Sequence, residues 1–78
     1  MHLVMIEWED SAFAQGWMNK EAIGTHKVSD CISVGLLVFG NDKQITIMQS
    51  VSKGQYGDGL TIPKRCIKRI RKLKIERR

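Results

Sequence analysis

The stretch Cys31–Ser52, CISVGLLVFGNDKQITIMQSVS, decides the fold. Aliphatic residues recur at every second position on both sides of Gly40-Asn41-Asp42, and this alternation is typical of strands with one face packed on a core. Gly40-Asn41-Asp42 itself has the composition of a tight turn. The stretch therefore predicts a central β-hairpin, with Val34 and Ile47 in the core.

The segments before this hairpin predict one more strand and little else. Residues 2–9 alternate apolar and polar side chains, which predicts a strand with Trp8 on its core side. Ser11–Trp17 mixes small residues with glycine and predicts a loop with room for one helical turn. Asn19 is a good cap for a short helix over Lys20–Ile23.

The segments after the hairpin are harder to interpret. Lys53–Gly59 contains three glycines and predicts a turn-rich loop, followed by a short strand that ends at Pro63. The three-residue spacing of Ile67, Ile70 and Leu73 suits a helix that Pro63 opens. Because β-branched residues are frequent here and a sheet needs a closing edge, we favour one helical turn over Pro63–Cys66 and then a strand over Ile67–Lys74.

This order of elements is that of an all-β, small five-stranded barrel, as in Src-homology-3-like and Sm-like folds. The 78 residues allow a single domain, residues 1–78, with a modest core. A fold of this kind does not by itself identify a function. The function therefore has to be sought in charge and in individual side chains.

Charge is concentrated at one end of the chain. Residues 64–78 hold nine cations and one acid, whereas residues 1–63 carry four cations and seven acids. Such asymmetry favours a polyanionic partner, although a basic edge that only aids solubility is the plainer alternative. On a strand, Arg69 and Arg71 would face one side and Lys68, Lys72 and Lys74 the other. The predicted phosphate ligands are Lys64, Arg65, Lys68, Arg69, Arg71 and Lys72.

Four further residues are candidates for contacting a small ligand. Trp17 lies in a glycine-containing loop, where an aromatic ring is free to stack on a base. Ser33 and Ser50, with Ser52, lie off the main aliphatic rows of two adjacent strands and predict a polar groove, or else a solvent-facing serine row. Gln49 falls on an apolar face, where it is either a buried network residue or a site residue.

Several classes of site lack their usual patterns. Cys31 and Cys66 are far apart and form no Cys-x-x-Cys pair, so we predict two reduced structural thiols, no metal and no cofactor. No motif joins a nucleophile to a base, which predicts a non-enzymatic protein without catalytic residues. Cys31–Gly40 is about half the length that crosses a bilayer, which predicts a soluble, cytoplasmic protein with no membrane partner.

Motifs spread over nearly the whole chain resemble those of a group of short uncharacterised bacteriophage and prophage accessory proteins. They are Trp8-x-Asp10-Ser11, Gly16-Trp17, Cys31-x-Ser33-Val34-Gly35-x-Leu37-Val38, Gln49-Ser50-x-Ser52, Gly57-Asp58 and Ile62-Pro63-x-x-x-Ile67-x-x-Ile70-Arg71-x-Leu73. The resemblance implies a viral gene expressed in a bacterial cytoplasm. It also implies action by binding.

We therefore expect a binding protein that engages a phosphate-rich ligand, with nucleic acid as the default. The alternatives are an anti-defence protein that sequesters a host nucleotide second messenger at an oligomer interface, and a small inhibitor of a host protein. A homodimer or higher homo-oligomer is expected, because a core of this size is marginal and an unclosed barrel leaves a strand edge to cover.

Overall fold

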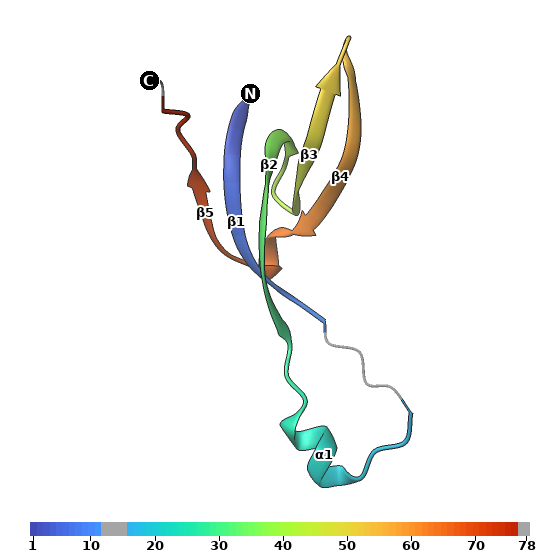
Figure 1. Ribbon diagram of the computed structural model, residues 1–78. Helices are drawn as coiled ribbons and strands as arrows, with labels where there is room; N and C mark the ends of the chain where they lie inside the picture. The colour runs from blue at the N-terminus through green and yellow to red at the C-terminus, as the bar shows by residue number, and fades with distance from the viewer. Residues whose placement is uncertain (12–15, 77–78) are drawn as a thin grey trace.

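The computed structural model describes residues 1–11 and 16–76. Its elements are β1 (His2–Asp10), α1 (Lys20–Thr25), β2 (Ser29–Gly40), β3 (Gln44–Ser52), β4 (Gln55–Pro63), the 3-10 turn η1 (Lys64–Cys66) and β5 (Ile67–Lys72) (Figure 1). The strands form one antiparallel sheet in the order β4-β3-β2-β1-β5. The predicted all-β fold with one short helix is confirmed. The predicted helical turn within Ser11–Trp17 falls largely on residues 12–15, outside the described part.

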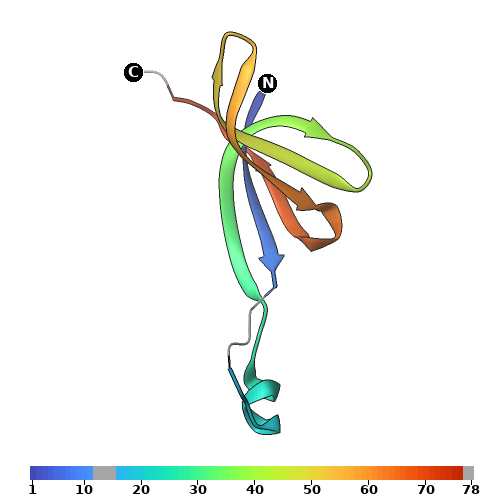
Figure 2. The same ribbon diagram turned by 90° about the vertical axis from the view of Figure 1, so that its right-hand side faces the viewer.

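The sheet separates into two parts along β2. This strand pairs with β1 along nearly its whole length, from Ser29 to Leu37, but it pairs with β3 only from Leu36 onward. Beyond Met48, β3 continues with β4 alone. Figure 2 shows the β3–β4 hairpin turning away from the β1–β2 ribbon. The sheet is consequently bent, and its inner face encloses the core.

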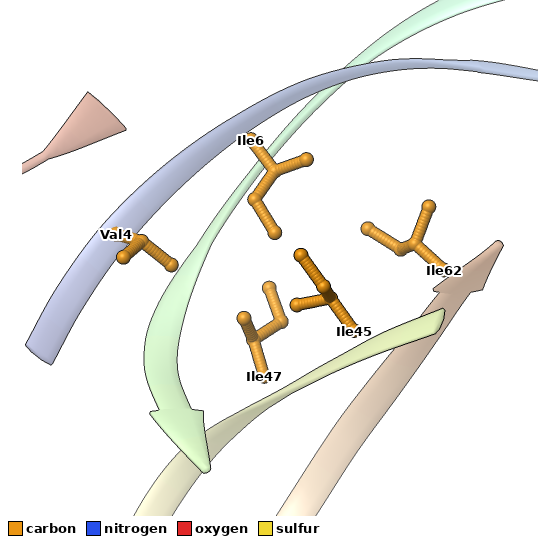
Figure 3. Close-up of a cluster of buried hydrophobic side chains, with 5 residues drawn as sticks. All are labelled: Val4, Ile6, Ile45, Ile47 and Ile62. Atoms are coloured by element: carbon orange, nitrogen blue, oxygen red, sulfur yellow. The ribbon is translucent and has the colours of Figure 1, made fainter. Parts of the chain in front are cut away.

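The core is small and entirely aliphatic. Its buried side chains are Val4, Ile6, Ile45, Ile47 and Ile62, which come from β1, β3 and β4 and converge on the inner face (Figure 3). All five are β-branched, and such side chains suit the pleated, half-buried surface of a sheet. Trp8, Leu37, Cys66 and Ile67 pack around the cluster and are only partly buried.

The face of β2 that meets the core is not the predicted one. Val34 is 42% exposed, so its assignment to the core is wrong, whereas Ile47 is buried as predicted. Gly35 lies opposite Val4 and faces the core instead. A Cβ atom on Gly35 would lie 3.0 Å from the Met48 carbonyl oxygen and 3.1 Å from the Ile47 Cβ. The absence of a side chain thus lets β3 cross close to β2.

The connection between β3 and β4 is shorter than predicted. Only Lys53 and Gly54 form the turn, with φ angles of 51° and 76°, and such positive φ values match the twist of a two-residue hairpin. Gly57 and Gly59 lie inside β4, so their assignment to a loop is wrong. The Met48 side chain occupies the space that a Cβ atom on Gly59 would need. Glycine here serves packing between strands.

The last segment of the chain confirms the turn-plus-strand interpretation. After η1, β5 pairs with β1 on the edge opposite β4. Within the described residues β4 and β5 do not pair with each other, so the sheet is open rather than closed. The same residues contain no helix that is long and apolar enough to cross a lipid bilayer.

A long projection gives the molecule its shape. Residues 16–28, here called the arm, extend with α1 away from the sheet (Figure 1). Asn19 caps α1 as predicted, since its side chain accepts a hydrogen bond from the Ala22 N–H at 2.8 Å. The radius of gyration is 16.3 Å, against about 11–12 Å for a compact domain of this length. None of the residues of α1 is buried.

Candidate functional site

A β-bulge in β5 sets the direction of the basic side chains. Trp8 pairs with Ile67 and Glu7 pairs with Arg69, so Lys68 is an extra residue on the bulged strand. Bulges commonly re-aim a side chain in this way. Lys68 therefore reaches the outer face, on the same side as Arg69 and Arg71. The expectation that Lys68 would face away from Arg69 is wrong, because simple alternation does not include the bulge.

Two of the predicted phosphate ligands are held by carboxylates of this chain. The Lys68 Nζ atom lies 2.8 Å from the Asp30 Oδ1 atom and 3.1 Å from the Glu9 Oε1 atom. Arg69 forms a longer ion pair with Glu7, at 3.7 Å between Nε and Oε2. These contacts join β5, β1 and β2 on the outer face. The charges of Lys68 and Arg69 are thus largely balanced by acids of this chain, in ion pairs that remain exposed to solvent.

The ion pairs of Lys68 give the stability of the fold a pH dependence. Hydrogen bonds to Asp30, and then to Glu9, raise the pKa of Lys68 above its usual value of 10.5. A raised folded-state pKa contributes stability that is complete below the unfolded pKa and is lost as the pH rises through the folded pKa. We therefore expect the stability difference between the wild type and Lys68→Met to shrink above pH 10.5.

Urea unfolding at a series of pH values between about 8 and 12 measures this difference. The matched control is Lys72→Met on the same strand, since Lys72 makes no ion pair with another described residue. Its difference from the wild type should stay flat over that range. A Lys68→Met difference that stays equally flat would contradict the stabilising role of the ion pairs.

The remaining predicted phosphate ligands are exposed and available. Lys64 and Arg65 lie on η1, beside the β2–β3 turn, where the Lys64 N–H donates to the Lys43 carbonyl at 2.8 Å. Arg71 and Lys72 lie at the far end of β5. Among residues 1–11 and 16–76, these four cations make no ion pair within 4.0 Å. Arg77 and Arg78 fall outside the described residues. The basic segment thus contains two ion-paired residues in its middle, Lys68 and Arg69, with exposed cations on both sides. We call the exposed, unpaired residues the available cations: Lys64, Arg65, Arg71 and Lys72.

A cleft opens where β2 and β3 separate. It has a volume of about 400 Å³ and is lined by Ser33, Val34, Ile47, Gln49, Asp58, Gly59 and Leu60. Gln49 is exposed, contrary to the buried alternative, and its Nε2 atom donates to the Val34 carbonyl at 2.8 Å. Ser33 accepts a hydrogen bond from the Trp8 Nε1 atom at 3.0 Å and keeps its own hydroxyl proton free to donate.

The cleft brings together only two of the four predicted small-ligand residues. Ser50 lines a separate depression at the β3–β4 hairpin with Ser52, so the predicted groove shared with Ser33 is wrong. Neighbouring residues on a strand point to opposite faces, which is why Gln49 and Ser50 part. Trp17 lies on the arm with its side chain fully exposed and lines none of the depressions described here.

The structure adds residues that sequence reasoning missed. Asp58 lines the cleft with a φ of 50°, and no cation shares that lining. Asp30 and Glu9 form the ion pairs with Lys68, and they lie together because Glu9 of β1 pairs with Asp30 of β2. This pairing cannot be seen in the sequence. Hydroxyl, amide and carboxylate groups suit hydrogen bonding to a base, a ribose or a basic side chain better than to a phosphate. Within the described part of the chain, no group of three His, Cys, Asp or Glu residues could hold a metal ion.

The available cations and the cleft therefore differ in chemistry. The cations supply point charges along a strand and a turn, and these fit a repeated anionic backbone. The cleft supplies directional hydrogen bonds. The chain matches no protein-family model, no curated protein and no solved structure, so these geometries carry the functional argument.

Proposed function

We propose that this protein is a non-enzymatic nucleic-acid-binding protein whose available cations contact backbone phosphates. The carrying observation is the division of the basic segment. Lys68 and Arg69 are paired with acids of this chain, whereas Lys64, Arg65, Arg71 and Lys72 are exposed and unpaired within the described residues. Exposed cations along an edge position a phosphate backbone without reading its sequence. Binding is therefore nonspecific and dependent on salt.

Several further features belong to the same proposal. The bent sheet is a partly open Src-homology-3-like barrel, as its strand order and the 3-10 turn before β5 favour. The protein works as a homo-oligomer, because the five side chains that the described residues bury form a small core. Its resemblance to phage accessory proteins supports a role in the cytoplasm of an infected bacterium.

The test replaces two available cations and compares them with two cations elsewhere. Arg71→Ser with Lys72→Ser should weaken binding to labelled duplex DNA and flatten its salt dependence, because each lost phosphate contact lowers the slope by about 0.9. The control is Lys20→Ser with Lys53→Ser, which removes the same charge from the arm and the β3–β4 turn. Titrations at about 50 and 200 mM salt measure both effects.

Each result of this titration bears on the proposal. A control pair that reduces affinity as much as the Arg71 and Lys72 pair would show that net charge alone acts. No binding of the wild type to DNA or RNA at low salt would overturn the proposal. Lys68→Ser is not suitable as a test, since it also removes the contacts to Asp30 and Glu9.

A second candidate function rests on the cleft. Gln49 and Ser33 supply amide and hydroxyl groups and Asp58 a carboxylate, which suits the base and ribose of a nucleotide second messenger. Its phosphates would then need cations from outside the cleft, such as those of a second copy. Depletion of cyclic and linear dinucleotides from solution by the wild type, and loss of this depletion in Gln49→Ala, would favour sequestration over DNA binding. Inhibition of a host protein is the third alternative, favoured if neither ligand binds.

A further inference from the structure

One segment of β2 lacks a neighbour on one side. From Ser29 to Val34 this strand pairs with β1, and β3 joins its other side only at Leu36. The Val34 carbonyl points to that side, since it accepts from Gln49 of β3. Backbone groups two residues apart on a strand point the same way. The N–H and C=O groups of Asp30 and Ile32 therefore face this side with no strand opposite them among the described residues. We call this segment the open edge.

The other two edges of the sheet carry features that discourage strand pairing. β5 carries lysines and arginines along its length, and β4 contains Gly57, Gly59 and a positive φ at Asp58, and ends at Pro63. Charged side chains, glycines and irregular backbone are common protections of edge strands. The open edge has none of these over Ser29–Val34 except Asp30 itself, which Lys68 holds at 2.8 Å.

Three aliphatic side chains at and beside the open edge are exposed. Val28, Ile32 and Val34 are 57%, 67% and 42% exposed. They share a row with Asp30, and the other row consists of the small residues Ser29, Cys31 and Ser33. A strand that pairs with the open edge would place its own side chains next to both rows, one on each face of the sheet. A suitable occupant is thus an extended segment that places aliphatic side chains beside Val28, Ile32 and Val34 and no acid beside Asp30.

A second copy of this chain supplies such a segment. In an antiparallel pairing with a twofold axis at Cys31, Asp30 lies opposite the partner's Ile32, and the reciprocal pair forms on the other side of the axis. This register uses the free backbone groups of Asp30 and Ile32 and leaves the Val34 carbonyl with Gln49. It also places Val28 opposite the partner's Val34 and Ser29 opposite the partner's Ser33. The edge is therefore complementary to itself, as a twofold interface requires.

The charged side chains near the axis are compatible with this register. Each Asp30 carboxylate keeps its contact with Lys68, so the axis brings no unpaired acids together. Lys27, which precedes Val28, arrives at the mouth of the partner's cleft, whose lining contains Asp58 and no cation. The rest of the arm carries the exposed apolar side chains of Trp17 and Ile23.

We propose that two copies of this protein associate through their open edges, with Cys31 at the twofold axis, into one continuous antiparallel sheet. This interface does not depend on the nucleic-acid proposal, because it involves the β1–β2 side of the protein and none of the available cations. It specifies the interface of the proposed homo-oligomer. Its tests are made without nucleic acid, so a monomeric wild type would overturn the oligomer and leave nucleic-acid binding to its own test.

The first test joins the two copies at the axis. Residues opposite each other in a non-hydrogen-bonded antiparallel pair have Cα atoms about 4.5 Å apart, which a disulfide spans. Cys66→Ser leaves Cys31 as the single thiol, and diamide takes up the two electrons and two protons that a pair of thiols gives up. We expect a covalent dimer in non-reducing electrophoresis. The matched variant Cys31→Ser, with Cys66 alone, should stay monomeric on the gel.

The second test blocks the open edge by charge. Ile32→Lys places a cation in the middle of the edge at an exposed position, so the fold is retained. Val51→Lys, at a 48% exposed site on β3, is the control. Sedimentation should give the wild type and Val51→Lys twice the mass of Ile32→Lys. A wild type that is monomeric at high micromolar concentration, an Ile32→Lys dimer, or cross-linking through Cys66 alone would overturn the proposed interface.

Discussion

Ile47→Asp is expected to abolish the cooperative unfolding transition. Ile47 is 1% exposed in the aliphatic cluster that also contains Ile6 of β1 and Ile62 of β4. Removing such a side chain costs about 2–5 kcal/mol, and an unpaired buried carboxylate adds several more. A domain of this length has about 4–12 kcal/mol of total stability. The variant should therefore lack a sigmoidal transition in urea followed by circular dichroism.

The control for this prediction lies on the same strand. Val51→Asp places the same carboxylate at a 48% exposed position and should unfold with nearly the wild-type midpoint. Val34→Asp should also fold, since Val34 is 42% exposed on the face turned away from the core. Loss of the transition in Val34→Asp, or its retention in Ile47→Asp, would contradict the assignment of the inner face.

Gly35→Ala is expected to destabilise the protein by about 1–3 kcal/mol, the usual cost of forcing an extra group into packed space. The new methyl group would lie 3.0 Å from the Met48 carbonyl oxygen and 3.1 Å from the Ile47 Cβ, so backbone as well as side chain has to move. Separating β2 from β3 at this point also disturbs the pair Leu36–Met48. The midpoint of urea unfolding measures the loss.

Gly57→Ala is the control, because it distinguishes the steric effect at Gly35 from the general effect of replacing a glycine in a strand. A Cβ atom on Gly57 meets nothing closer than the Ser50 Cβ at 3.9 Å, so Gly57→Ala has room. It should be neutral or slightly stabilising, because alanine restricts the unfolded chain. Equal destabilisation by Gly35→Ala and Gly57→Ala would show that the close crossing of β3 over β2 is not what Gly35 provides.

Most strands were predictable because alternation is a local signal. The first strand and the central hairpin show it, and the structure has them in the predicted places. The final strand does not alternate, and it was predicted from its β-branched residues and from the need of the sheet for a closing edge. The inner face of β2 was not predictable, since Leu36 and Val38 on one face are as apolar as Leu37 and Phe39 on the other. Only the pairing of Val4 with Gly35 decides between the faces.

Features that depend on pairing were predicted least well. Gly57-Asp58-Gly59 has the composition of a turn, and it lies in a strand because β3 supplies its hydrogen bonds and the Met48 side chain needs the space. The bulge at Lys68 leaves no mark in the sequence. The available and paired cations therefore look identical until the register shows which of them lie near Glu7, Glu9 and Asp30.

The pairing of β1 with β5 has a consequence for the order in which the sheet assembles. The pairs Val4–Lys72 and Trp8–Ile67 join opposite ends of the chain, whereas the β3–β4 hairpin closes around Lys53 and Gly54. Closing a long loop costs more entropy than closing a tight turn, so non-local pairs form late. We expect the hairpins to form early and β5 to dock last. Until then β1 presents an unpaired edge of its own, and slow refolding at high concentration would favour aggregation through it.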